Sequence, residues 1–184
     1  MRVIAGRFGG RSLQAPRGLS TRPTSDRVRE ALFQVLGDVT GLSVLDLYAG
    51  TGALGIESLS RGAARVVFVE SGRSALACLR RNTQSLGIED SCELLPLSVE
   101  RARKAICARA PFHLVLCDPP WDQVGDAMLA LGDLLGRGIL GAGGRVVVEH
   151  RAGTELRVPA GFALLRERHR RWGDTGVSIF SAEE

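Results

Sequence analysis

The sequence has little lysine, little tyrosine and no long hydrophobic run. Lys104 is the only lysine among 24 cationic residues, and no apolar stretch approaches the roughly 20 residues that a membrane helix needs. The first residues are too interrupted to form the apolar core of a secretory signal. These absences disfavour lysine-dependent chemistry and membrane insertion, and we expect a cytoplasmic protein. The 184 residues, 45% of them hydrophobic, suffice for one globular domain with a sizeable core.

Cysteine is scarce and shows no metal-binding pattern. The four cysteines contain no CxxC pair, and the three histidines have no ligand spacing beside them. Buried free thiols in a reducing compartment are therefore expected, with no disulfide and no metal site. The cysteines are Cys78, Cys92, Cys107 and Cys117.

Positive charge is concentrated in the N-terminal segment. Residues 1–36 contain seven arginines against Asp26 and Glu30, which gives +5, whereas the whole chain carries +4. Coding bias explains most of the preference for arginine over lysine, but this uneven distribution is typical of nucleic-acid binders. Residues 3–5 and 11–14 flank the pair Gly9-Gly10, which predicts a short hairpin. We expect a basic arm over residues 1–24 and a single α/β domain over residues 25–184.

The rest of the chain alternates between strand and helix patterns. After a helix that starts near Ser25 and ends at Leu36, the sequence predicts strands at 43–47, 65–69, 92–95, 112–117 and 145–149. Helices are predicted between them at 53–61, 74–86, 99–108 and 124–135. Two further strands, 162–166 and 176–180, are expected as an antiparallel hairpin at one edge. This order predicts a Rossmann-like, doubly wound sheet of seven mostly parallel strands with helices on both faces.

A glycine-rich turn follows the first strand of that sheet. Gly50, Gly52 and Gly55 match a dinucleotide fingerprint, and Glu70 ends the next strand, where a ribose-binding acid belongs. A tight turn without a ligand is the alternative interpretation. Asp46 lies at the strand end, where a carboxylate repels pyrophosphate and attracts an ammonium or sulfonium group. The pattern therefore favours S-adenosylmethionine over a nicotinamide cofactor.

A second motif, Asp118-Pro119-Pro120-Trp121, follows the apolar strand 112–117. The two prolines hold the backbone extended and remove two donors. The Asp118 carboxylate and the Pro119 carbonyl can then accept both hydrogens of an amino group while Trp121 stacks on its ring. Such an arrangement leaves the nitrogen lone pair free to attack a methyl group. The structural alternative is a proline turn with a packed tryptophan.

These segments together resemble the RsmD-type 16S rRNA guanine-N2 methyltransferases, a family of class I S-adenosylmethionine-dependent enzymes. The turn from Asp46 to Gly52 is similar to their motif I, and residues 118–121 are similar to motif IV of amino-group methyltransferases. Residues 22–33 resemble the segment that precedes the fold in this family, and the similarity extends to residues 172–175. It covers nearly the whole chain.

The resemblance implies methyl transfer to the exocyclic N2 of one guanine of small-subunit rRNA, at the position that the family's usual name numbers 966. S-adenosylhomocysteine is the implied product, and a monomer acting on 16S rRNA, free or within an assembling small subunit, is the implied form. Implied cofactor-binding residues are Asp46, Gly50, Gly52 and Glu70, and implied catalytic residues are Asp118, Pro119, Pro120 and Trp121.

Two positions depart from the family pattern. Trp121 stands where phenylalanine or tyrosine is commoner, and Ser98 stands where an aspartate or asparagine often reads the adenine amino group. Ser98 is kept as a cofactor-binding candidate, with backbone groups as the alternative contact.

RNA contacts are expected on the basic arm, with a solvated surface as the alternative. The candidates are Arg2, Arg7, Arg11, Arg17 and Arg22. Near the C-terminus, four arginines either extend this patch or form a solvated edge. They are Arg166, Arg168, Arg170 and Arg171. If residues 162–168 form a strand, its alternate positions place arginines on one face.

Three other functions remain open from the residues alone. The Asp-Pro-Pro-aromatic motif also fits enzymes that methylate adenine N6 in DNA or RNA. A small NAD(P)-dependent reductase would use the glycine turn but would leave residues 118–121 unexplained. A non-catalytic RNA-binding assembly factor would retain the fold with an idle site.

Overall fold

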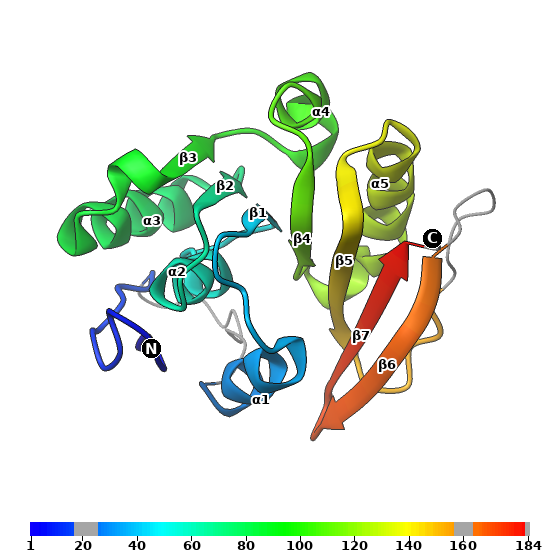
Figure 1. Ribbon diagram of the computed structural model, residues 1–184, viewed down its shortest axis with the longest axis horizontal. Coiled ribbons are helices and arrows are strands. Elements are labelled where there is room, and N and C mark those ends of the chain that lie inside the picture. Colours follow the sequence, from blue (N-terminus) through cyan, green and yellow to red (C-terminus); the bar gives the residue numbers. More distant parts are fainter. Residues whose placement is uncertain (17–25, 157–163, 183–184) are drawn as a thin grey trace.

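The computed structural model describes residues 1–16, 26–156 and 164–182, and its centre is a seven-stranded sheet (Figure 1). The strand order is β3-β2-β1-β4-β5-β7-β6. The strands are β1 (Ser43–Leu47), β2 (Arg65–Val69), β3 (Cys92–Leu95), β4 (Phe112–Cys117), β5 (Leu140–Arg151), β6 (Leu164–Trp172) and β7 (Thr175–Ala182). Strands β1 to β5 pair in parallel, and β7 is antiparallel to both β5 and β6. This confirms the predicted mostly parallel, Rossmann-like fold with an antiparallel edge.

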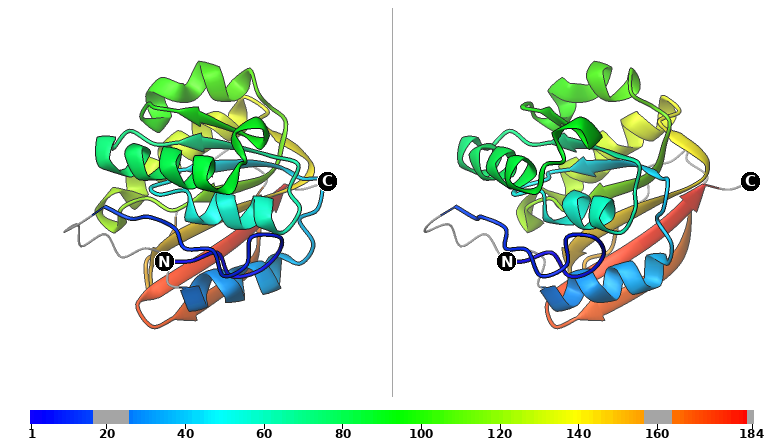
Figure 2. Two further views of the ribbon diagram at one scale, coloured as in Figure 1. Left: turned by 90° about the vertical axis from the view of Figure 1, so that its left-hand side faces the viewer. Right: turned by 60° about the vertical axis from the view of Figure 1, so that its left-hand side comes forward.

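Helices cover both faces of the sheet (Figures 1 and 2). They are α1 (Asp26–Leu36), α2 (Ala53–Ser60), α3 (Arg73–Leu86), α4 (Val99–Cys107) and α5 (Val124–Gly136), with 3₁₀ turns η1 (Glu89–Ser91) and η2 (Trp121–Gln123). Leu32, Ile56 and Leu79 of the first three helices share one core with Val44 of β1, whereas Leu45 faces a second core beneath α4 and α5. Because β1 is buried on both faces, apolar residues occupy both faces of the strand, and Asp46 interrupts them near its end.

Two strands are longer than the sequence predicts. Strand β5 begins at Leu140 instead of residue 145, because a register shift against β4 accommodates Gly141, Gly143 and Gly144, which show no strand periodicity. Strand β6 continues to Trp172 instead of ending at residue 166. Its arginine-rich segment has no alternating apolar pattern, but its backbone pairs with β7 at the sheet edge. Residues 162–163 lie outside the described part.

The N-terminal segment, residues 1–16, folds back on itself and packs against the domain. Arg2 and Ser12 form one antiparallel bridge, while Val3 and Leu13 are buried in the core shared with α1 and α2. The expected hairpin is thus a short loop closed by one bridge rather than a pair of strands. The expected boundary between residues 24 and 25 falls in residues 17–25, which the structure does not describe.

Within the described ranges, every helix is too short or too polar to cross a membrane.

Candidate functional site

The two chemically distinctive loops lie side by side at the carboxyl ends of the central strands. Leu47 at the end of β1 is in register with Cys117 at the end of β4 and with Val69 at the end of β2. The Asp118 backbone N–H donates to the Leu47 carbonyl at 3.4 Å, which joins the start of one loop to the strand residue that precedes the other. Strand order reverses between β1 and β4, and open α/β sheets bind ligands at such a position.

The turn from Tyr48 to Gly52 has a backbone that glycine makes possible. Gly50 and Gly52 adopt positive φ angles of 57° and 84°, and Tyr48 adopts 58°, an unusual conformation for a non-glycine residue. A Cβ added to Gly50 would meet only the Tyr48 carbonyl, at 4.0 Å, so this side of the turn is open. A Cβ on Gly52 would come within 2.3 Å of Leu79 Cδ1. Gly50 therefore leaves room for a ligand, whereas Gly52 leaves room for the core.

Asp46 lies beneath this turn and is almost fully buried, with 1% of its surface exposed. Its Oδ2 accepts a hydrogen bond from the Gly55 backbone N–H at 2.9 Å, which fastens the start of α2 to the end of β1. Burial raises the Asp46 pKa to about 8, and the charges of Asp118 and Glu70 add to the rise. Sequence reasoning placed Asp46 facing a ligand; the structure places its carboxyl group inside the turn.

Glu70 also holds the turn from the end of β2. Its Oε2 accepts a hydrogen bond from the Gly50 N–H at 2.7 Å, and its Oε1 accepts one from the Gly72 N–H at 2.5 Å. Glu70 is only partly buried, and a carboxylate has further acceptor sites for a ribose diol. The open side of Gly50 and this carboxylate therefore fit a nucleoside cofactor with an amino-acid end.

Ser98 occupies the N-cap position of α4, after β3. Its backbone carbonyl accepts the Ala102 N–H at 2.9 Å, and its side chain makes no capping hydrogen bond. Ser98 lies at the same carboxyl edge because β3 is in register with β2 through Leu95 and Val69.

In the Asp118–Trp121 segment, Pro120 has an extended backbone, as proline favours, and the 3₁₀ turn η2 begins at Trp121. Pro119 is buried, Pro120 is exposed with φ −50° and ψ 137°, and Asp118 is partly buried. The Pro120 carbonyl accepts the Gln123 N–H at 2.8 Å and closes the 3₁₀ turn η2. Trp121 is partly exposed at the start of η2, and the Arg151 guanidinium lies 5.9 Å from the centroid of its ring. An acid and an aromatic plane thus stand at the strand end beside the glycine turn.

The candidate RNA-binding arginines of the N-terminal segment are exposed on an anchored loop. Arg2 forms an ion pair with Asp26 at 3.5 Å, Arg11 donates to the Ser85 carbonyl at 3.2 Å, and the Arg7 guanidinium lies 4.3 Å from the centroid of the Phe8 ring. All three arginines are exposed, so they are accessible to a polyanion. Arg17 and Arg22 lie outside the described residues.

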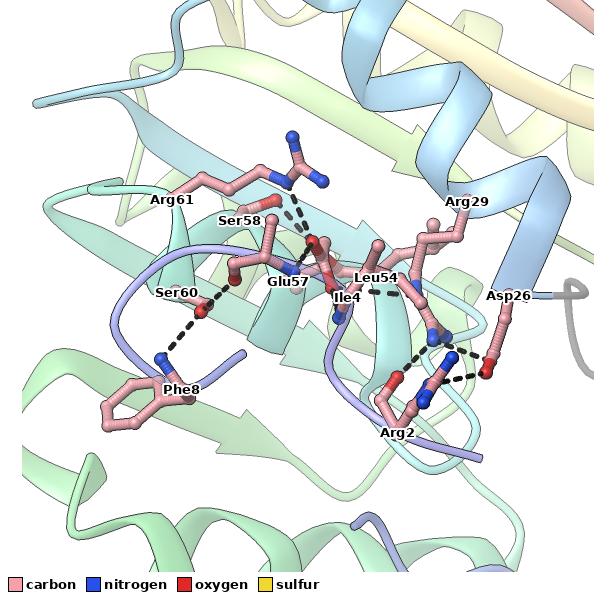
Figure 3. A network of polar contacts seen from close by, with 12 residues as sticks. Arg2, Ile4, Phe8, Asp26, Arg29, Leu54, Glu57, Ser58, Ser60 and Arg61 are labelled. Atoms are coloured by element: carbon pink, nitrogen blue, oxygen red, sulfur yellow. Dashed lines mark hydrogen bonds and ion pairs between the residues drawn. The ribbon is translucent and has the colours of Figure 1, made fainter. Parts of the chain in front are cut away.

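Glu57, which sequence reasoning missed, anchors this loop (Figure 3). Its fully buried carboxylate accepts the backbone N–H groups of Ile4 at 2.7 Å and Ala5 at 3.1 Å, and forms an ion pair with Arg61 at 2.7 Å. Arg29 of α1 is also fully buried, 3.7 Å from Glu57, and burial lowers its pKa. The one available signal was an acid inside the apolar helix pattern of 53–60, which required a buried partner.

A register shift in β6 separates the backbone positions of the C-terminal arginines Arg166 and Arg168. A register shift places Arg166 opposite Phe180 and Arg168 opposite Ile179, and these two β7 residues belong to different cores. Arg168 and Arg170 share a face, and both are exposed, as is Arg171. The shift breaks the alternation that the expectation assumed.

The described residues contain no group of three or more potential metal ligands. All four cysteines are free, with Cys78 and Cys117 buried and the other two partly buried.

Comparison with known proteins gives a consistent result. A family profile described as "Conserved hypothetical protein 95" matches residues 1–181. The chain is 38% identical over 183 residues to "Putative rRNA methyltransferase YlbH" of Bacillus subtilis, covering 98% of each protein. It is 34% identical over 171 residues to "Ribosomal RNA small subunit methyltransferase D" of Escherichia coli, covering 91% of this chain and 84% of that protein.

Solved structures agree with these matches. The structure titled "Putative methyltransferase yhhF from Escherichia coli" superposes with a TM-score of 0.81 at 31% identity, covering 100% of this chain and 98% of that one. A methyltransferase-like protein solved with S-adenosylhomocysteine has a TM-score of 0.70 at 16% identity, covering 85% of this chain and 49% of that one. This second likeness concerns the fold alone.

Proposed function

This chain belongs to the RsmD/YlbH family of S-adenosylmethionine-dependent methyltransferases, and we propose that it methylates the exocyclic N2 amino group of a guanine in 16S rRNA. The position implied by the family resemblance is guanine 966. The observation that carries the proposal is the juxtaposition of two strand ends: Asp118 is hydrogen-bonded to Leu47, the residue that immediately precedes the glycine turn. A nucleoside cofactor and a planar amino substrate bound there would meet.

The cofactor is assigned to the turn after β1. Bound S-adenosylmethionine supplies an electrophilic methyl group on a sulfonium centre. Gly50 offers its open side to the amino-acid end, while Gly52 and Asp46 keep the turn in shape from beneath. Glu70 accepts hydrogen bonds from the ribose hydroxyls, and Ser98 lies on the adenine side.

The substrate guanine is assigned to the Asp118 loop. A base must leave its stack, or be presented in a single strand, before a buried amino-group site can reach it. Trp121 stacks on the purine ring, while the Asp118 carboxylate and the Pro119 carbonyl accept the two N2 hydrogens; Pro120 keeps the loop extended. The nitrogen lone pair then points away from both acceptors. Positioning supplies most of the rate enhancement, and the proton lost from N2 passes to Asp118 or to solvent.

RNA docking is assigned to the exposed arginines of the N-terminal segment. Arg2, Arg7 and Arg11 lie on a loop that Glu57 fixes to α2, so the charges are presented with little loss of conformational freedom. Arg17 and Arg22 extend the same basic segment in sequence. The proposed form is a cytoplasmic monomer that acts on 16S rRNA or on an assembling small subunit.

The decisive experiment compares wild type with Asp118→Ala. Wild type incubated with S-adenosylmethionine and unmodified 16S rRNA should methylate one guanine, located by mass mapping of nuclease fragments. Asp118→Ala should reduce this activity at least about a hundredfold, because it removes the carboxylate that is proposed to accept one N2 hydrogen and to orient the amino group. Its calorimetric affinity for S-adenosylhomocysteine should stay within about twofold of wild type. The neighbouring exposed acid gives a matched control, Asp122→Ala, with normal activity.

Each alternative function gives a different outcome in the same assays. Label on adenine instead of guanine would replace the proposal with N6 methylation. Binding of NADH without S-adenosylhomocysteine would identify a reductase. Binding of RNA and S-adenosylhomocysteine without turnover on any rRNA form would indicate an assembly factor.

A further inference from the structure

Asn82 of α3 contacts two segments that are far apart in the sequence. Its Oδ1 accepts a hydrogen bond from the Gln14 backbone N–H at 2.7 Å, and its Nδ2 donates to the Gln14 carbonyl at 3.1 Å. The same Nδ2 donates to the Thr51 carbonyl at 3.0 Å. With only 1% of its surface exposed, Asn82 is a buried amide whose oxygen and nitrogen are both engaged. An amide can donate and accept at once, which neither a carboxylate nor an apolar side chain can do.

The Thr51 carbonyl belongs to the peptide unit between Thr51 and Gly52, in the part of the glycine turn that leads into α2. Thr51 lies between two glycines with positive φ, Gly50 and Gly52, and the other end of this peptide, the Gly52 N–H, donates to the Ala49 carbonyl at 2.8 Å. Two other hydrogen bonds hold the rest of the turn: the Ala49 N–H donates to the Val69 carbonyl, and the Gly50 N–H donates to the Glu70 carboxylate. Asn82 thus supplies a third anchor, and it comes from outside the strand ends.

The other side of Asn82 holds the N-terminal segment where it leaves the domain. Both backbone groups of Gln14 pair with the amide, as a neighbouring strand would pair them. Glu57 and Ser60 fix the segment elsewhere, along the C-terminal half of α2. Among the hydrogen bonds of the described residues, only those of Asn82 reach both the segment and the glycine turn.

We propose that Asn82 is a positioning residue that couples the N-terminal segment to the cofactor turn. A displacement of the segment at Gln14 moves the Asn82 amide, which reorients the Thr51 carbonyl and with it the open side of Gly50. Where the segment binds RNA, which rests on the proposed function, RNA and cofactor then strengthen each other's binding by the same factor, because coupling between two sites is reciprocal.

The test perturbs the segment and measures the cofactor in the absence of RNA. Gln14→Pro removes the N–H that Asn82 Oδ1 accepts, at a residue that lies outside the turn. Gln14→Ala keeps both backbone groups and serves as the matched control. Isothermal titration with S-adenosylhomocysteine should give a Kd raised about threefold to tenfold in Gln14→Pro, the effect of one hydrogen bond. The control should match wild type.

Asn82→Ala removes all three bonds and should raise the same Kd further. In methylation assays, both disruptive variants should raise the KM for S-adenosylmethionine with little change in kcat, a split that general destabilisation below the unfolding temperature does not produce. With a 16S rRNA transcript, S-adenosylhomocysteine should tighten RNA binding to wild type and not to Gln14→Pro. An unchanged S-adenosylhomocysteine Kd in Gln14→Pro would overturn the coupling, whether or not Asn82→Ala folds. Failure of the wild-type protein to bind the 16S rRNA transcript would instead refute the proposed RNA function.

Discussion

Gly50 and Gly52 lie two residues apart in one turn, and alanine should mainly reduce cofactor affinity at Gly50 and stability at Gly52. Both have positive φ, so alanine at either position costs about 1–2 kcal/mol of backbone strain. At Gly50 the added methyl group meets nothing closer than the Tyr48 carbonyl at 4.0 Å. Strain is then the whole cost to stability, and the methyl group stands in the space assigned to the cofactor.

At Gly52 the methyl group collides with the core. Its Cβ would lie 2.3 Å from Leu79 Cδ1 and 3.2 Å from Ile56 Cδ1, and both side chains are completely buried. Overpacking of this kind costs about 1–3 kcal/mol in addition to the strain. The free energy of unfolding of Gly52→Ala should therefore fall by about 2–5 kcal/mol, against about 1–2 kcal/mol for Gly50→Ala.

Urea denaturation and calorimetry with S-adenosylhomocysteine separate the two effects. Gly50→Ala should lose at least about tenfold in affinity while staying the more stable variant, because its methyl group occupies ligand space. Wild-type affinity in Gly50→Ala would show that the open side of the turn does not face the cofactor. Equal stability of the two variants would refute the assignment of Gly52 to core packing.

Two further predictions follow from charges. The raised Asp46 pKa of about 8 means that the folded protein binds the Asp46 proton more tightly than the unfolded chain does. The free energy of unfolding therefore includes a contribution from this proton that is present at low pH and is lost as the pH rises toward 8. The loss is at most about 1.4 kcal/mol per pH unit. Asp46→Asn should remove this slope in urea denaturation between about pH 5 and about pH 8, and parallel profiles would contradict the assignment. The double variant Arg7→Glu/Arg11→Glu should weaken binding of 16S rRNA and lower the slope of log affinity against log salt concentration by about 1 to 2. The control Arg101→Glu, at an exposed position of α4 on the other face of the sheet, should change neither quantity. An unchanged slope in the double variant would mean that the N-terminal segment is a solvated surface that does not contact RNA.

Much of the fold was predictable because its signals are local. The run at 112–117 and the glycine after residue 86 mark a buried strand and a helix end within a few residues of sequence. Strands β5 and β6 were predicted too short because glycines and arginines hide their periodicity, while their backbones pair with neighbours that are distant in the chain. Element type was thus readable where the side chains themselves set the pattern.

The candidate site divides in the same way. Asp46, Glu70 and Asp118 were found at strand ends because strand order places those ends together. The local sequence did not show whether a residue of the site faces a ligand or the protein interior. In the structure, the Asp46 carboxylate accepts a hydrogen bond from Gly55, and the absence of a side chain at Gly52 leaves space for Leu79. Burial of a side chain depends on all the elements that pack around it.

The sequence by itself determined the order of strands and helices, the two motifs and the excess of positive charge at the N-terminus. Only the tertiary structure decided that the basic segment is anchored rather than free, through Glu57 and Asn82. These contacts join residues 52 to 68 positions apart. No periodicity or turn pattern spans such distances, and a buried acid or amide finds its partner only when the chain has folded.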